Sequence, residues 1–184
     1  MNKTYTTEEG GGGMRTEALR IAGTNPAIVF NASEKNASIT VDKRKYNLQP
    51  AEWMHIKETI GFSGSNIAVS ADCFYCMLDQ DGDLELWSYP LKRPPKEEAS
   101  LQIIHGGTGR LTAKARYGDT FPSLNPGSST SPITLFVPMD VVIDFYESTE
   151  HRKGTYHYVT KENQAGMLLY TGSCLYFIEI FPSH

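Results

Sequence analysis

The sequence predicts a mostly β, α+β fold of curved antiparallel sheets with one or two short helices. Ten tyrosines and eight phenylalanines in 184 residues favour strands, because aromatic side chains pack well on a pleated surface. Short apolar segments alternate with turn signals along most of the chain, as in sheets built from hairpins. One segment, which begins at Pro50, has the apolar spacing of an amphipathic helix instead.

The chain divides into a short tail and one β-rich domain. Residues 1–14 are polar and contain four consecutive glycines, so we expect a flexible tail. Residues 15–184 are numerous enough for a single domain with a sizeable core. Within that domain, segments 19–61 and 67–147 suggest a pseudo-repeat in which strands lead into a helix.

The first strands surround a basic turn. We expect a strand at residues 27–30, followed by a hairpin with arms at 38–41 and 46–48. The tip of this hairpin, residues 42–45, places three cations together: Lys43, Arg44 and Lys45.

The clearest helical pattern follows this hairpin. Pro50 suits a first helical turn, because the N–H group that proline lacks has no intrahelical partner there. Trp53, Ile56 and Ile60 fall at i, i+3 and i+7 and form one apolar stripe. Gly61 then stands where a C-terminal cap is expected. The pattern therefore predicts a helix from Pro50 to Ile60.

The rest of the chain is expected to be mainly strands. The expected strands are residues 73–78, 84–89, 101–105, 110–117, 133–137, 155–160 and 167–181, the last broken near Gly172. Residues 118–132 are rich in Pro, Gly and Ser and predict a long loop, a class that is usually functional or mobile. Residues 139–147 fit a helical stripe or a β-branched strand, and Pro138 in the first-turn position favours the helix.

No motif in the sequence indicates catalysis or a metal site. Cys73 and Cys76 are spaced like zinc ligands, but no second pair exists, and on a strand this spacing gives opposite faces. The acidic segment 79–83 lacks the EF-hand positions and contains Asp-Gly, so it predicts a hairpin turn. No serine, cysteine or zinc hydrolase signature is present. We therefore expect a binding protein with no enzymatic activity and no metal or cofactor.

The sequence also carries expectations about the compartment. No stretch approaches the roughly 20 apolar residues that span a bilayer, so we expect no membrane span. The first residues lack the apolar core of a secretory signal. We expect an intracellular protein, in the cytoplasm or nucleus, or in a virion if the protein is viral.

Positive charge is clustered although the formal net charge is −4. In the segment 110–117, side chains that alternate across a strand would place Arg110, Thr112, Lys114 and Arg116 on one face. Two interpretations remain open. The cations could follow the phosphates of an extended nucleic acid, or they could form a solvated outer face with acidic partners on the neighbouring strand.

Residues 38–60 resemble the strand-to-helix junction of the transcriptional positive-cofactor-four family. That family has a Leu-x-Pro step followed by Trp, Lys, Glu and Ile at offsets similar to those here, namely Leu48, Pro50, Trp53, Lys57, Glu58 and Ile60. The resemblance implies a curved sheet that binds single-stranded DNA through basic and aromatic residues, with the helix in dimer contacts. A second strand–Pro138–helix unit is similar to the tandem arrangement of Whirly-type proteins, which also bind single strands.

Together these patterns predict a homo-oligomer that binds single-stranded DNA or RNA without reading its sequence. The expected contact residues are Lys43, Arg44, Lys45, Tyr46, Arg110, Lys114, Arg116 and Tyr117. The cations would meet phosphates, and the two tyrosines would stack on bases. This prediction requires the cations of the two segments to gather on one concave sheet. The alternative is a viral capsid or matrix subunit with a β-sandwich or jelly-roll fold, and a small enzyme or an adaptor comes third.

Overall fold

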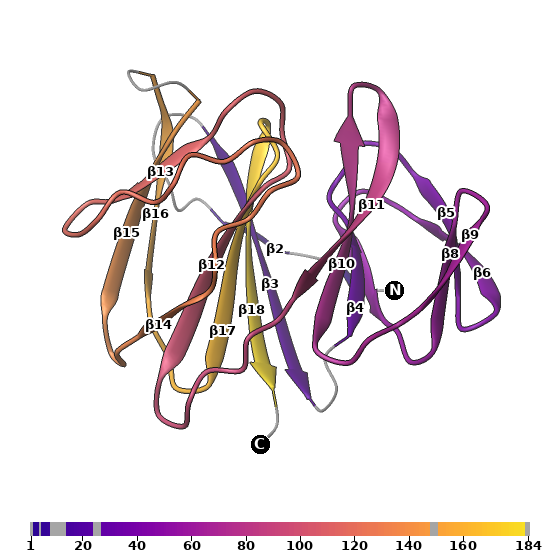
Figure 1. The fold of residues 1–184 in the computed structure, drawn as a ribbon, viewed down its shortest axis with the longest axis horizontal. Helices are drawn as coiled ribbons and strands as arrows, with labels where there is room; N and C mark the ends of the chain where they lie inside the picture. Colours follow the sequence, from indigo (N-terminus) through magenta and orange to yellow (C-terminus); the bar gives the residue numbers. More distant parts are fainter. Residues whose placement is uncertain (1, 4, 8–13, 24–26, 148–150, 183–184) are drawn as a thin grey trace.

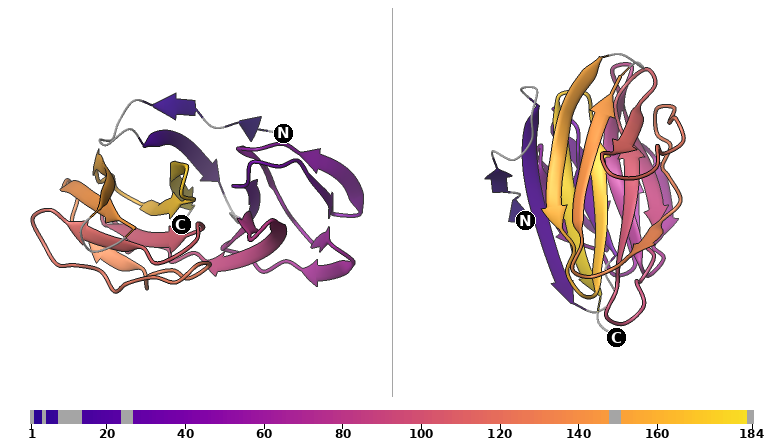
Figure 2. Two further views of the ribbon diagram at one scale, coloured as in Figure 1. Left: turned by 90° about the horizontal axis from the view of Figure 1, so that it is seen from above. Right: turned by 90° about the vertical axis from the view of Figure 1, so that its left-hand side faces the viewer.

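The protein is a stack of β-sheets. The computed structural model describes residues 2–3, 5–7, 14–23, 27–147 and 151–182. Four sheets lie in layers, in the order three-stranded, six-stranded, five-stranded and four-stranded (Figures 1 and 2). The mostly β prediction is confirmed. The expected short helices are wrong, because none of the described residues is helical.

The two inner sheets contain both parallel and antiparallel pairs. The five-stranded sheet has the order β1 (Asn2–Lys3), β7 (Glu52–His55), β4 (Ile28–Asn31), β10 (Cys73–Gln80), β11 (Asp83–Pro90). The six-stranded sheet has the order β14 (Ile133–Leu135), β12 (Ala99–His105), β17 (Gln164–Tyr170), β18 (Cys174–Pro182), β3 (Arg15–Gly23), β2 (Tyr5–Thr7). Since β4–β10, β12–β17 and β3–β18 are parallel, the expectation of purely antiparallel sheets is wrong.

The two outer sheets are antiparallel throughout. The four-stranded sheet has the order β6 (Arg44–Leu48), β5 (Ala37–Val41), β8 (Thr59–Phe62), β9 (Ser65–Ala68). The three-stranded sheet has the order β13 (Thr112–Ala115), β15 (Asp140–Tyr146), β16 (Arg152–Val159). The predicted β5–β6 hairpin is confirmed, but its turn is only Asp42 and Lys43, both with positive φ as a two-residue hairpin turn requires.

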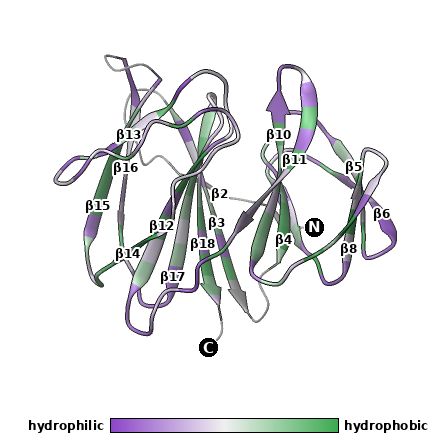
Figure 3. Cartoon of the chain, in the orientation of Figure 1, coloured by the Kyte–Doolittle hydropathy of each residue, from purple (hydrophilic) through white to green (hydrophobic). Residues whose placement is uncertain are grey.

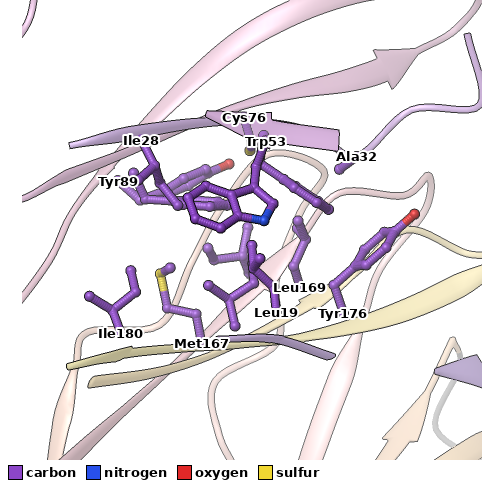
Figure 4. Close-up of a cluster of buried hydrophobic side chains, with 14 of the residues drawn as sticks. Leu19, Ile28, Ala32, Trp53, Cys76, Tyr89, Met167, Leu169, Tyr176 and Ile180 are labelled. Carbon is purple, nitrogen blue, oxygen red and sulfur yellow. The ribbon is translucent and has the colours of Figure 1, made fainter. Parts of the chain in front are cut away.

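Three apolar cores separate the four layers. The middle core lies between the inner sheets, where Ile28, Trp53 and Tyr89 face Leu19, Met167 and Ile180 (Figure 4). Each inner sheet is covered on both faces, so its central strands are almost continuously hydrophobic (Figure 3). The predicted opposite orientation of two cysteines is confirmed: Cys76 packs in the middle core and Cys73 in the core beneath the four-stranded sheet.

The helix predicted from Pro50 to Ile60 is wrong. The segment forms β7, a bend and β8. Ala51 has a left-handed φ of 65°, which ends any helical turn after Pro50. Trp53 is buried in the middle core, whereas Ile56 and Ile60 are buried in the adjacent one. A single helical stripe cannot fill two cores on either side of a sheet, so long-range pairing overrides the local pattern.

The helix favoured for residues 139–147 is also wrong, because most of this segment is β15. Val141, Ile143 and Phe145 are buried in the core between the three- and six-stranded sheets. The intervening Val142 and Asp144 lie on the other face of the strand, so the core-facing residues recur every two positions rather than every 3.6. The β-branched residues therefore decided this element, not the proline before it.

The topology repeats within the chain. In the five-stranded sheet the order β7-β4-β10-β11 has a parallel central pair, and β14-β12-β17-β18 in the six-stranded sheet repeats that order and those directions. Each half also adds an outer sheet, in which β5-β8-β9 corresponds to β13-β15-β16 and β6 has no counterpart among the described strands. The halves run from β4 to β11 and from β12 to β18, so their boundaries differ from the expected 19–61 and 67–147.

The N-terminal segment contains strands where a flexible tail was expected. β1 pairs with β7 at one edge of the five-stranded sheet, and β2 pairs with β3 at one edge of the six-stranded sheet. The glycine run at 10–13 lies outside the described residues.

Candidate functional site

The eight predicted contact residues fall into two groups on opposite ends of the stack. The first group belongs to the four-stranded sheet and consists of Lys43, Arg44, Lys45 and Tyr46. The second group lies in or beside β13 of the three-stranded sheet and consists of Arg110, Lys114, Arg116 and Tyr117. Two inner sheets separate them (Figure 1). The expected gathering on a single concave sheet is therefore wrong.

In the second group, Arg116 has an acidic partner. Its guanidinium donates from Nη2 to Oδ1 of Asp144 at 2.7 Å, and Thr155 donates to the same carboxylate. Burial would raise the pKa of Asp144, but the bonds from Arg116 and Thr155 and the charge of Arg152 outweigh burial and lower it. For Arg116, the structure thus favours the interpretation of an outer face with cross-strand acidic partners.

The other members of this group are arranged differently. Lys114 lies opposite Asp144 in the sheet, with its Nζ 5.0 Å from the ring centre of Tyr146. The predicted alternation is confirmed up to Ala115, because Leu111 and Ala113 are buried. Tyr117 lies beyond the end of the strand and is 88% exposed.

The first group lies on a hairpin whose tip is fixed to its neighbour. The carboxylate of Asp42 accepts backbone N–H groups from Lys57, Glu58 and Thr59 at 3.0, 2.6 and 3.1 Å. These bonds attach the tip, including Lys43, to the start of β8. The backbone at the hairpin tip is therefore held against β8 by the Asp42 side chain.

The outward face of this sheet is polar and small. Ile39, Val41 and Ile60 point into the core. The alternate positions form a row across all four strands, because pairing joins Lys45 to Thr40, Thr40 to Gly61, and Gly61 to Asn66: the row is Lys45, Thr40, Gly61 and Asn66. Glycine and short side chains at the centre of the row leave the surface hollow.

This hollow is a groove of about 800 Å³. Its lining includes two cations and no carboxylate; the polar side chains that line it include Ser38, Thr40, Lys43, Lys45, Asn47 and Asn66. Tyr46 and Phe62 also line it, but their side chains lie on the inward face with Ile39 and Ile60 and are half-buried against the core. Arg44 lies opposite Val41 on the inward side of the edge strand and does not line the groove. The sheet thus offers a concave surface with cations and hydrogen-bonding groups.

The sequence analysis did not identify most of the uncharged residues that line the groove. Ser38 and Thr40 alternate with buried Ile39 and Val41, so the period of two already indicated that they face outward. Gly61 and its neighbours on β9 carried no such signal, because the chain before them had the spacing of a helix.

The described residues show no metal centre and no membrane helix. Among them, no three His, Cys, Asp or Glu side chains are arranged to hold a metal ion. The described part of the chain also has no helix that is long and apolar enough to cross a membrane. Its three cysteines are buried and free, and burial raises the pKa of the Cys174 thiol to about 11.

No protein-family model matches this chain, and no curated protein sequence shows significant similarity to it.

Proposed function

We propose that this protein binds single-stranded nucleic acid, without reading its sequence and without catalysis, along the groove on the four-stranded sheet. The observation that supports this proposal most directly is the charge of the groove. Lys43 and Lys45 line it, no carboxylate does, and among the described residues neither lysine forms an ion pair. A local cationic surface on a protein of net charge −4 favours an anionic ligand there.

The groups in the groove match the chemistry of a nucleic-acid backbone. The lysines meet phosphates, and the hydroxyl and amide groups of Ser38, Thr40 and Asn47 hydrogen-bond to phosphate and sugar oxygens. Tyr46 and Phe62 lie on the strand face of buried Ile39 and Ile60 and pack against the core, so we assign no base stacking to them. An open groove of this kind accommodates any base, so sequence selectivity is not expected.

A fluorescence-anisotropy titration tests this proposal. A labelled single strand of ~12 nucleotides is titrated at two or more salt concentrations. This length lies within the ~4–16 nucleotides that one small single-strand-binding domain covers. Each phosphate contact to a single strand contributes about 0.7 to the slope of log K against log salt, so Lys43→Ala/Lys45→Ala should reduce the slope by about 1.4. Affinity at low salt should fall by roughly one order of magnitude.

The chain provides a matched control. Arg110→Ala/Lys114→Ala removes the same number of cations from the opposite end of the stack and leaves Arg116 paired with Asp144. We expect the affinity and salt slope of this variant to match the unmodified protein. If wild type fails to bind, or if both double variants lose the same affinity, the groove is not the site.

A role in structural assembly, such as a capsid or matrix subunit, is the second candidate. Its support is an apolar surface at the other end of the molecule, where Tyr117 and Phe136 are 88% and 80% exposed. Salt distinguishes the two roles, because phosphate-driven binding weakens as salt rises, whereas association through apolar surface persists or strengthens.

A further inference from the structure

Uncharged hydrogen-bonding side chains from all four strands point into the groove on the four-stranded sheet. They are Ser38 and Thr40 on β5, Asn47 on β6, Thr59 on β8 and Asn66 on β9. Within the described part of the chain, none of these five side chains hydrogen-bonds to another group of the protein. Hydroxyl and amide groups both donate and accept, so the groove offers a ligand both kinds of hydrogen bond.

Gly61 keeps the centre of the groove open beside one of these hydroxyls. Its φ is not positive, so its backbone conformation does not require glycine. A Cβ atom at this position would lie 3.2 Å from Cβ of Thr40 and 3.7 Å from its Oγ1. Glycine weakens the interior of a strand and often marks a place where a ligand approaches the backbone closely. Gly61 therefore leaves the Thr40 hydroxyl open to a ligand.

The aromatic rings of this sheet do not provide a stacking surface. Tyr46 pairs with buried Ile39, and Phe62 lies on the face of buried Ile60, so both rings turn toward the core. Stacking uses the faces of the bases, which DNA and RNA both have. Without it, binding in this groove depends on the phosphates and sugars of the nucleic-acid backbone.

The charged and uncharged groups lie on neighbouring strands. Lys45 on β6 is directly opposite Thr40 on β5, and both residues point outward. Neighbouring strands of a sheet are only about 4.8 Å apart. A sugar whose phosphate meets Lys45 therefore lies within reach of the Thr40 hydroxyl.

We propose that the groove selects RNA over DNA by hydrogen bonds to the 2′-hydroxyl group of ribose. This inference rests on the proposed function, because it specifies which single strand the same groove prefers. The 2′-hydroxyl both donates and accepts, and it is the group by which a protein distinguishes RNA from DNA. Thr40 meets it first, with Ser38 and Asn47 at the next positions along the strands. Deoxyribose has no group to bond with these side chains.

Anisotropy titrations of the full chain with three labelled strands of ~12 nucleotides test the proposal. Oligouridine and oligodeoxyuridine have the same bases and phosphates and differ only at the 2′ carbon. The RNA should bind at least ~10-fold more tightly. This ratio should be the same at each salt concentration, because both strands carry equal numbers of phosphates. A 2′-fluoro strand, which cannot donate from the 2′ position, should bind like DNA.

Thr40→Val identifies the protein group involved, because valine keeps the branched shape and lacks the hydroxyl. RNA binding should weaken ~3–10-fold, the effect of one uncharged hydrogen bond, and DNA binding should change less than ~2-fold. Thr112→Val is the matched control. Thr112 lies on β13 at the opposite end of the stack, so its replacement should leave both affinities unchanged.

The possible results separate this inference from the proposed function. Equal affinities for RNA and DNA would overturn the inference and leave the proposed function standing. So would a 2′-fluoro strand that binds as tightly as RNA, or an RNA preference that Thr40→Val leaves intact. Failure of all three strands to bind would overturn the proposed function, and this inference with it.

Discussion

Asp42 both forms the hairpin turn beside the groove and bonds that turn to β8. Its φ of 49°, beside 71° at Lys43, lets the hairpin reverse in two residues. Aspartate tolerates this left-handed conformation better than most residues do. Its ionised carboxylate also accepts the three backbone bonds that attach the tip to β8. The attachment of the hairpin tip to β8 therefore depends on this one carboxyl.

We expect this dependence to appear as an effect of pH on stability. Burial would raise the pKa of Asp42, but the backbone bonds from Glu58, Thr59 and Lys57 outweigh burial and lower it below 3.8. A carboxyl with a lowered pKa contributes stability that is complete above the pKa of the unfolded chain and is lost as pH falls through the folded pKa. Asp42→Asn keeps the turn but should reduce stability by roughly 1 kcal/mol at neutral pH.

Urea unfolding of wild type and Asp42→Asn at several pH values measures this effect. The difference between the two proteins should be constant near neutrality and should shrink below about pH 4. A difference that stays the same down to acidic pH would contradict the role of the ionised carboxyl.

Equivalent strands of the two outer sheets carry different side chains on their outward faces. Across the four-stranded sheet, Thr40, Gly61 and Asn66 form a row on β5, β8 and β9. The corresponding strands of the three-stranded sheet carry the row Lys114, Asp144 and Thr155. In that row Asp144 accepts a hydrogen bond from Thr155 and also pairs with Arg116, whereas glycine and short side chains leave the first row hollow. The groove is therefore confined to one of two similar outer sheets.

On β15, the substitution Asp144→Asn should lower the stability of the protein. The side chain of Asp144 is only 11% exposed, and its carboxylate binds Arg116, Thr155 and Arg152. Loss of its charge weakens the bonds to the arginines, which should reduce the free energy of unfolding by roughly 2 kcal/mol. Asp140→Asn, on the same strand with a side chain 74% exposed, is the control and should change stability by less than about 0.5 kcal/mol. Equal effects in chemical denaturation would argue against a special role for Asp144.

At the scale of the whole molecule, the two halves share local chemistry as well as topology. Asn31 ends β4 and donates from Nδ2 to the carbonyl of Lys35, four residues on. His105 ends β12 and donates from Nε2 to the carbonyl of Gly109, again four residues on. Both side chains are fully buried. The stack is thus two related sandwiches whose inner sheets share the middle core.

The sequence by itself determined the features that depend on near neighbours. Asp81 and Gly82 adopt the positive φ of a tight hairpin turn, as Asp-Gly between apolar segments predicts. The alternation from Leu111 to Ala115 and the opposite faces of Cys73 and Cys76 follow from the period of a strand. The clustering of Lys43 and Lys45 could also be predicted, because the two residues are close in sequence and lie on one hairpin.

Only the tertiary structure decided which sheet each strand joins. The stripe of Trp53, Ile56 and Ile60 has the spacing of a helix, yet long-range pairing distributes it over two cores. The same pairing places Lys45 and Lys114 on opposite outer layers and brings Gly61 beside Thr40 to form the groove. Local propensities amount to fractions of a kcal/mol per residue, whereas burial of one large side chain contributes about 1.5–3 kcal/mol. Contacts between distant segments therefore determined the layers, and with them the site.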